Sequence, residues 1–185
     1  MTLCQPRDGF APVSRAAFVG WAVAYVLFLI YASLNTGGFL FIDLANLMIH
    51  EAGHTVFSWG GYYFQVFGGT LAQVLVPLAC LVFFMRRGQT TAVAFAAFWC
   101  FENLLYIATY MGDARMSALP LVGGDESDWT ILFSHWGVLP HDRAIAGWTR
   151  GVGWIGMLLA VVWLGWMHLT STAVDRADYT GAHLD

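Results

Sequence analysis

Residues 50–54 read His-Glu-Ala-Gly-His, an HExxH motif inside an apolar stretch of the chain. Side chains four residues apart share a helix face, so His50 and His54 can present two imidazoles to one metal ion. Glu51 would lie beside that ion, where a general base can take a proton from a metal-bound water. Zinc lowers the pKa of such a water to about 7. The motif therefore predicts a Zn2+ hydrolytic site with Glu51 as the catalytic base.

A catalytic zinc ion takes three protein ligands and keeps one position open, so the motif needs a third ligand from elsewhere. Two acidic residues are candidates, Glu102 within an apolar stretch and Asp113 eleven residues later. Eleven residues make about three helical turns, so both carboxylates would lie on one helix face. Because a glutamate inside a membrane is costly without a partner, we expect Glu102 to face the same polar interior as the histidines. Either acid could be the third ligand, or Glu102 could be a structural buried acid paired with arginine or a backbone amide.

Two polar residues precede the motif on the same predicted helix. Asp43 lies seven residues before His50 and Asn46 four residues before it, so their side chains lie on the face of the imidazoles. They could be alternative ligands, could fix the imidazole tautomers by hydrogen bonds, or could line a path for water. Asp43 could instead lie at the membrane edge, where it would simply be solvated.

The composition places the chain in a membrane. Of its 185 residues, 58% are hydrophobic and 11% are charged, and the mean hydropathy is +0.62. Soluble domains have about 25% charged residues, so we expect an integral membrane protein in contact with a lipid bilayer. The net charge of -4 is small and the sequence has no basic patch, so nucleic acid is not an expected partner.

Long apolar runs predict an all-α, multi-pass helical bundle, since a spanning helix needs about 20 mostly apolar residues. We predict five spans, near residues 16–34, 39–59, 68–85, 91–111 and 150–169. The polar loop 112–143 holds Trp129, Leu132 and Phe133 at helical spacing, which predicts a short helix on the membrane surface. We expect a single domain over residues 1–185, located in a bacterial inner membrane.

Two histidines of this polar loop, His135 and His141, have Asp128 and Asp142 nearby. We expect these histidines to be solvated rather than bound to metal, as histidines of exposed loops usually are. They could also cap the cavity or contact a partner.

Arginines give conflicting signals on orientation, because cytoplasmic loops carry an excess of lysine and arginine. Arg7 and Arg15, which come before or at the first span, favour a cytoplasmic N-terminus. Arg86 and Arg87 favour the opposite if all five spans cross fully. Counted over the whole chain, more arginines fall inside when the N-terminus is cytoplasmic, and we expect that orientation.

The HEAGH run is followed about fifteen residues later by Gly-Gly-Thr-Leu-Ala-Gln-Val-Leu-Val-Pro at residues 68–77. This arrangement resembles the site-2 protease-like (M50-type) intramembrane zinc metalloproteases, over about residues 39–115. In that family a G-x-x-x-N pattern follows the motif, and Gln73 stands here where asparagine is usual. The family's third ligand is an aspartate in an Asn-Pro-containing run, where this chain has Met-Gly-Asp-Ala at residues 111–114.

The resemblance implies His50, His54 and Asp113 as zinc ligands and Glu51 as the base. It also implies a protease that hydrolyses a membrane-embedded peptide, so a membrane protein would be the substrate. An alternative is a non-catalytic membrane subunit that keeps a zincin-like scaffold and packs in a larger bioenergetic or photosynthetic complex. A metal-dependent membrane enzyme of another kind, or a transporter, comes last, because the chain has few histidines and no repeat.

Overall fold

The computed structural model describes residues 9–35, 38–122 and 126–181, with the side chains described as far as residue 171. Every regular element in these ranges is helical, which confirms the all-α class. The elements are α1 (Arg15–Leu34), α2 (Asp43–Val56), η2 (Ser58–Gly60), α3 (Tyr62–Arg86), α4 (Thr90–Asp113), α5 (Asp128–His135), η3 (Leu139–His141) and α6 (Asp142–Gly181).

Four helical stretches of the described chain are long and apolar enough to cross a membrane: α1, α3, α4 and Leu139–Ser171, which covers η3 and most of α6. The count of five spans is not confirmed, because the segment 39–59 does not form a long helix. Its helix α2 has 14 residues, about 21 Å of length, whereas the hydrocarbon core of a bilayer is about 30 Å thick. The motif therefore lies on a helix that is too short to cross.

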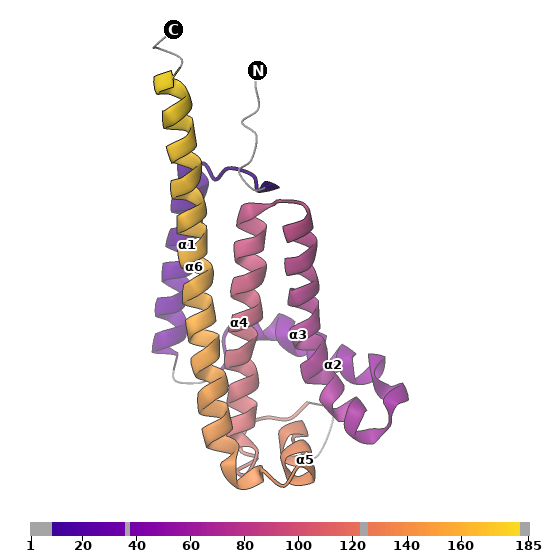
Figure 1. Ribbon diagram of the computed structural model, residues 1–185. Coiled ribbons are helices and arrows are strands. Elements are labelled where there is room, and N and C mark those ends of the chain that lie inside the picture. Colours follow the sequence, from indigo (N-terminus) through magenta and orange to yellow (C-terminus); the bar gives the residue numbers. More distant parts are fainter. Residues whose placement is uncertain (1–8, 36–37, 123–125, 182–185) are drawn as a thin grey trace.

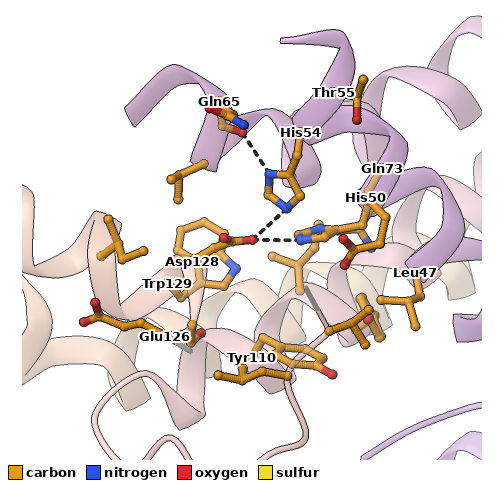
Figure 2. A pocket seen from close by; sticks show the side chains of 18 of the residues that line it. Leu47, His50, His54, Thr55, Gln65, Gln73, Tyr110, Glu126, Asp128 and Trp129 are labelled. Atoms are coloured by element: carbon orange, nitrogen blue, oxygen red, sulfur yellow. Dashed lines mark hydrogen bonds and ion pairs between the residues drawn. The ribbon is translucent and has the colours of Figure 1, made fainter. Parts of the chain in front are cut away.

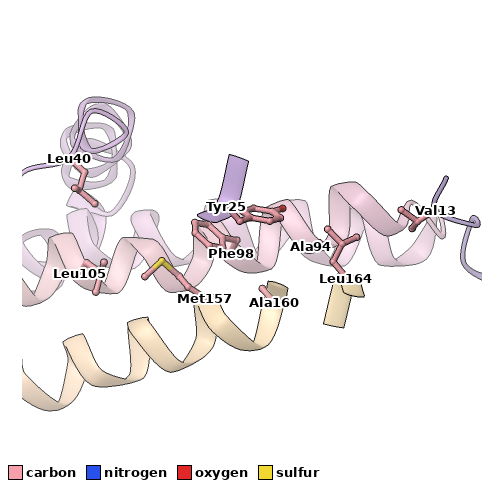
Figure 3. Packing of buried hydrophobic residues seen from close by; sticks show 9 residues of the cluster. All are labelled: Val13, Tyr25, Leu40, Ala94, Phe98, Leu105, Met157, Ala160 and Leu164. Carbon is pink, nitrogen blue, oxygen red and sulfur yellow. The ribbon is translucent and has the colours of Figure 1, made fainter. Parts of the chain in front are cut away.

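Helix α4 lies between α3 and α6 and forms the centre of the bundle. Phe98 of α4 packs against Tyr25 of α1, and Met157 and Leu164 of α6 complete this buried apolar cluster (Figure 3). Gly153 lets α6 approach α4 closely, since a Cβ atom there would lie 2.8 Å from the carbonyl oxygen of Phe101. Small residues at helix crossings commonly allow such contact in membrane bundles.

Helix α2 packs against the first half of α3 through glycine. A Cβ atom on Gly53 would collide with the carbonyl oxygen of Gly68 and would lie 2.7 Å from the Cβ atom of Ala72. Each glycine thus permits the backbone contact that holds the motif helix on α3. After α2 the chain passes through η2 and turns into α3 at Gly61, whose φ of 88° suits glycine.

Helix α5 is the short helix expected in the polar loop, but it packs on the bundle rather than presenting its apolar side to lipid. Trp129, Leu132 and Phe133 are buried in a second apolar cluster with Val66 of α3 and Ile107 of α4. Burying three large side chains contributes several kcal/mol, at about 1.5–3 kcal/mol each. This packing fixes the start of α5 next to α2 and α3.

The membrane-crossing helices run side by side, and the bundle has two distinct ends (Figure 1). At one end, Ala11 donates its backbone N–H to the carbonyl of Gly88 at 2.7 Å, in the turn between α3 and α4. The Nδ1 atom of His168 on α6 lies 2.8 Å from the carbonyl oxygen of Val13, next to the start of α1. We call this the turn end; α5 and η3 lie at the opposite one, the site end (Figure 1).

Candidate metal centre

His50 and His54 lie on one face of α2, as their spacing predicts. Their ring centroids are 4.7 Å apart and the ring planes are nearly perpendicular, at 85°. With Glu51 they form a group whose potential ligand atoms all lie within 4.8 Å of one another, close enough to hold one metal ion. Within the described residues, the motif is thus presented as the sequence predicts, with both imidazoles half-buried.

Asp128, at the first position of α5, reaches both imidazoles. Its Oδ2 atom is 2.8 Å from Nε2 of His50 and 3.2 Å from Nε2 of His54 (Figure 2). Two imidazole nitrogens and one carboxylate oxygen are donor types that catalytic zinc takes in proteins. These three side chains fit a zinc ion, because their ligand atoms converge on one point from two separate elements.

A hydrogen bond at Nδ1, on the side of the ring away from Asp128, orients each imidazole. The Nδ1 atom of His50 lies 2.8 Å from Oε1 of Gln73, and that of His54 lies 2.9 Å from the backbone carbonyl oxygen of Gln65. A carbonyl oxygen only accepts, so each Nδ1 carries the proton and donates it. The two Nε2 atoms are left to face Asp128, the arrangement that outer hydrogen bonds give to metal-binding histidines.

The electrostatics of this cluster favour a positive charge among the three side chains. The hydrogen bond to Asp128 raises the pKa of His54 to about 9, against the opposing effect of burial. Burial alone would raise the pKa of Asp128, but the hydrogen bonds from His50 and His54 outweigh it and lower that pKa. A carboxylate that stays ionised between two imidazoles is a suitable neighbour for a bound cation.

Gly69 of α3 lies directly against the two rings. A Cβ atom at this position would lie 2.7 Å from Nε2 of His50 and 2.7 Å from Nε2 of His54. Real Cβ atoms do not approach other atoms so closely, so a larger residue would push the imidazoles or α3 aside. Glycine here therefore allows the α3 backbone to form the floor of the site.

Glu51, the expected base, lines the same cavity as His50, His54 and Asp128. This cavity has a volume of about 500 Å³. Tyr106 and Tyr110 of α4 form part of its wall, and Glu126, just before α5, contributes a further carboxylate. The motif thus faces a space large enough for several residues of an extended peptide, in the usual size range of ligand pockets.

The structure does not bring Asp113 to the histidines. Asp113 is the last residue of α4, and its Oδ2 atom accepts the backbone N–H of Leu119 at 2.9 Å. It does not line the cavity that contains His50 and His54. Its position fits a role in shaping the connection between α4 and α5.

Glu102, Asp43 and Asn46 come together, but with one another rather than with the imidazoles. The Nδ2 atom of Asn46 donates to Oδ1 of Asp43 at 3.1 Å and to Oε2 of Glu102 at 3.0 Å. The indole N–H of Trp99 donates to Oδ1 of Asn46 at 2.9 Å, and Asp43 accepts the backbone N–H of Leu40. All three polar side chains are buried, so Asp43 is not a solvated residue at the membrane edge. They tie α2 to α4 one turn before His50.

Asp128 is the residue that sequence reasoning missed, since it was named only as a neighbour of the loop histidines. The available signal was its position directly before Trp129, at the start of an amphipathic helix. When the apolar face of such a helix packs against the bundle, the residues of its first turn are brought to the bundle as well.

Gln73 was noted only as a substitute for asparagine, and the structure places its Oε1 atom beside Nδ1 of His50. His135 stacks on Tyr63 with ring centroids 3.6 Å apart, so it helps to dock α5.

No family model, curated protein or solved structure matches this chain. The residues and their geometry therefore carry the functional argument.

Proposed function

We propose that this chain is an intramembrane zinc metalloprotease, with His50, His54 and Asp128 as ligands and Glu51 as the base. The observation that carries the proposal is the convergence of two Nε2 atoms and the Oδ2 atom of Asp128 beside Glu51. The resemblance to site-2 proteases supports the same chemistry, with Asp128 in place of Asp113. The four apolar helices suit a multi-pass protein, and we place it in a bacterial inner membrane.

When bound, a zinc ion would act as a Lewis acid on the attacking water and on the peptide carbonyl. Glu51 takes a proton from that water, whose oxygen forms a bond to the carbonyl carbon. Glu51 then delivers the proton to the amide nitrogen as the C–N bond breaks, which yields a carboxylic acid and an amine. His50 and His54 keep their positions throughout, because Gln73 and the Gln65 carbonyl hold the rings from behind.

Gln73 has a second group available for the substrate. Its Nε2 atom is buried and has no hydrogen-bond partner among the described residues, while its Oε1 atom serves His50. A buried donor without a partner is costly, and a bound carbonyl oxygen would satisfy it. Gln73 would therefore both orient His50 and donate to the peptide carbonyl.

The direct test uses the protein purified in detergent, loaded with zinc and mixed with peptides that contain a membrane segment. Wild-type protein should bind about one zinc ion per chain and cleave such a peptide. Glu51→Gln should keep the zinc and lose cleavage, because only the base is removed. Glu126→Gln is the matched control, since it removes an exposed carboxylate of the same cavity. Wild-type protein without zinc would instead support a non-catalytic subunit, and equal cleavage by Glu51→Gln would remove Glu51 from the mechanism.

A further inference from the structure

Because α2 does not cross, the path of the chain differs from that of a five-span protein. The chain crosses in α1, turns back in α3, crosses again in α4 and returns in α6 (Figure 1). Hydrogen bonds join Ala11 to Gly88 and place His168 beside Val13, so these segments share the turn end. Arg15, Arg86 and Arg87 therefore lie on one side of the membrane. With four spans, Arg15 and the pair Arg86 and Arg87 therefore favour the same membrane orientation, whereas with five spans they favoured opposite ones.

The metal centre belongs to the opposite side. Asp128 lies in the connection between α4 and α6, and Leu121, Val122 and Glu126 of the same connection line the cavity. This connection is closed by Arg115, whose Nη2 atom lies 2.7 Å from Oδ1 of Asp142 at the start of α6. The cavity is therefore bordered by the polar segment at the site end, where water and a peptide can enter.

The charges of the two ends differ. At the turn end, the described residues include Arg15, Arg86 and Arg87, together with Asp175, Arg176 and Asp178 in the last part of α6. The described part of the site end carries the arginines and acids Arg115, Arg143, Arg150, Asp113, Glu126, Asp128 and Asp142. Four of the seven arginines among the described residues thus belong to the turn end and three to the site end. In the sequence Arg7 also precedes the first spanning helix, but it lies outside the described residues. An excess of arginine marks the cytoplasmic side.

We infer that the turn end is cytoplasmic and that the metal centre opens on the non-cytoplasmic face of the membrane. The substrate is then a peptide segment of a membrane protein at that face. The statement on the substrate rests on the proposed function, whereas the orientation does not. Exposed aromatic residues lie where the chain passes from α2 to α3, with Trp59 79% and Tyr62 61% exposed, and Tyr62 also lines the cavity. Tryptophan and tyrosine favour the membrane–water interface, so the scissile segment would lie at this level.

Cysteine accessibility in intact cells tests the orientation. The three native cysteines are replaced by serine, and a single cysteine is then introduced as Ser134→Cys at the site end or Gln89→Cys at the turn end. Both positions are exposed. A membrane-impermeant maleimide should label Ser134→Cys in intact cells and Gln89→Cys only after permeabilisation. The reverse pattern, or equal labelling of both in intact cells, would overturn the orientation.

A second measurement does not depend on replacing cysteines. The full chain is fused at its C-terminus to green fluorescent protein, which fluoresces when it stays in the cytoplasm, or to alkaline phosphatase, which is active only after export. We expect fluorescence and no phosphatase activity. Phosphatase activity without fluorescence would place the turn end outside and overturn the inference.

The substrate side is tested by co-expressing two membrane peptides that carry the same cleavable sequence, one on each face. Cleavage is expected only on the non-cytoplasmic face, and Glu51→Gln should abolish it. Cleavage on the cytoplasmic face alone would overturn the substrate assignment. If neither peptide is cleaved while the cysteine labelling is as expected, the proposed protease function fails and the orientation stands.

Discussion

The Oδ2 atom of Asp128 lies 2.8 Å from Nε2 of His50, although the two residues are 78 positions apart in the sequence. The short helix α5 makes this contact, because its buried apolar face docks on α3 and α4. The carboxylate that contacts both imidazoles therefore comes from outside the membrane-crossing helices.

Replacing Asp128 should remove the metal. Loss of a residue that hydrogen-bonds to a metal ligand typically lowers metal affinity about 10–100-fold. In Asp128→Asn the zinc affinity should fall further, because the substitution removes a proposed ligand itself. Competition with a chromophoric chelator measures this affinity. Asp113→Asn is the matched control and should bind zinc as the wild type does, since Asp113 contacts Leu119 instead. Loss of zinc in Asp113→Asn with retention in Asp128→Asn would reverse the assignment.

Gln73 should show two separable roles. Gln73→Leu removes the acceptor for His50 and should weaken zinc binding about 10–100-fold. Gln73→Glu keeps an acceptor for His50 but removes the Nε2 donor, so it should retain zinc and lose about 10²–10³-fold in kcat. Gln65→Ala should change neither quantity, because His54 uses the backbone carbonyl of Gln65. Equal zinc affinity in Gln73→Leu and wild type would show that Gln73 does not orient His50.

Gly69→Ala should damage the site by crowding. The new methyl group would meet both imidazoles, which costs about 1–3 kcal/mol when a packed region must shift. The thermal unfolding temperature and zinc affinity should both fall. Gly147→Ala is the control, because a Cβ atom there meets nothing within 4 Å, and alanine favours the helix by about 0.5–1 kcal/mol. A Gly69→Ala protein with unchanged zinc affinity would contradict the close approach.

Asp43 should make the protein less stable as the pH rises. Burial raises its pKa above the ordinary 3.8, although hydrogen bonds from Leu40 and Asn46 act in the opposite direction. The folded state then binds the proton more tightly than the unfolded state, so the contribution of Asp43 to stability is complete below pH 3.8 and is lost as the pH rises through the raised pKa. Asp128, whose pKa is lowered, acts only below 3.8. Thermal unfolding in detergent against pH should show this fall in wild type and lose it in Asp43→Asn.

His54 should give a second pH effect in the metal-free protein. Its pKa rises from 6.5 to about 9, chiefly through the hydrogen bond to Asp128. A raised folded-state pKa contributes stability that is complete below pH 6.5 and is lost as the pH rises through about 9. The unfolding temperature should fall over this window in chelator-treated protein. Asp128→Asn should flatten the fall, and a fall of equal size in that variant would assign it to another group.

Much of the fold follows from the sequence, because hydropathy and helical spacing are local properties. The helical class, the four apolar stretches and the common face of His50 and His54 could all be predicted in this way. Hydropathy could not show that the segment 39–59 fails to cross. It counts apolar residues, whereas the helix itself extends only from Asp43 to Val56 before the chain turns through η2 and Gly61.

The partners of buried polar residues could not be predicted, because they depend on contacts between distant segments. Glu102 was expected to have a polar partner inside the bundle, and it has one in Asn46. Glu102 was also expected to face the histidines, but its polar cluster lies one turn of α2 before His50 and is separate from the imidazoles. Asp128 could not be chosen among the acids of the polar loop, since its position depends on the docking of Trp129 and its neighbours.

The position of Asp128 after α4 also has a consequence for the order in which the site is made. A ribosome that has released the chain only as far as Asp113 has produced the motif, Gln73 and the floor at Gly69, yet only two of the three proposed ligands. The nascent protein thus carries His50 and His54 without their carboxylate partner while its first helices enter the membrane. Synthesis of α5 completes the set, so the centre matures only when most of the bundle already exists.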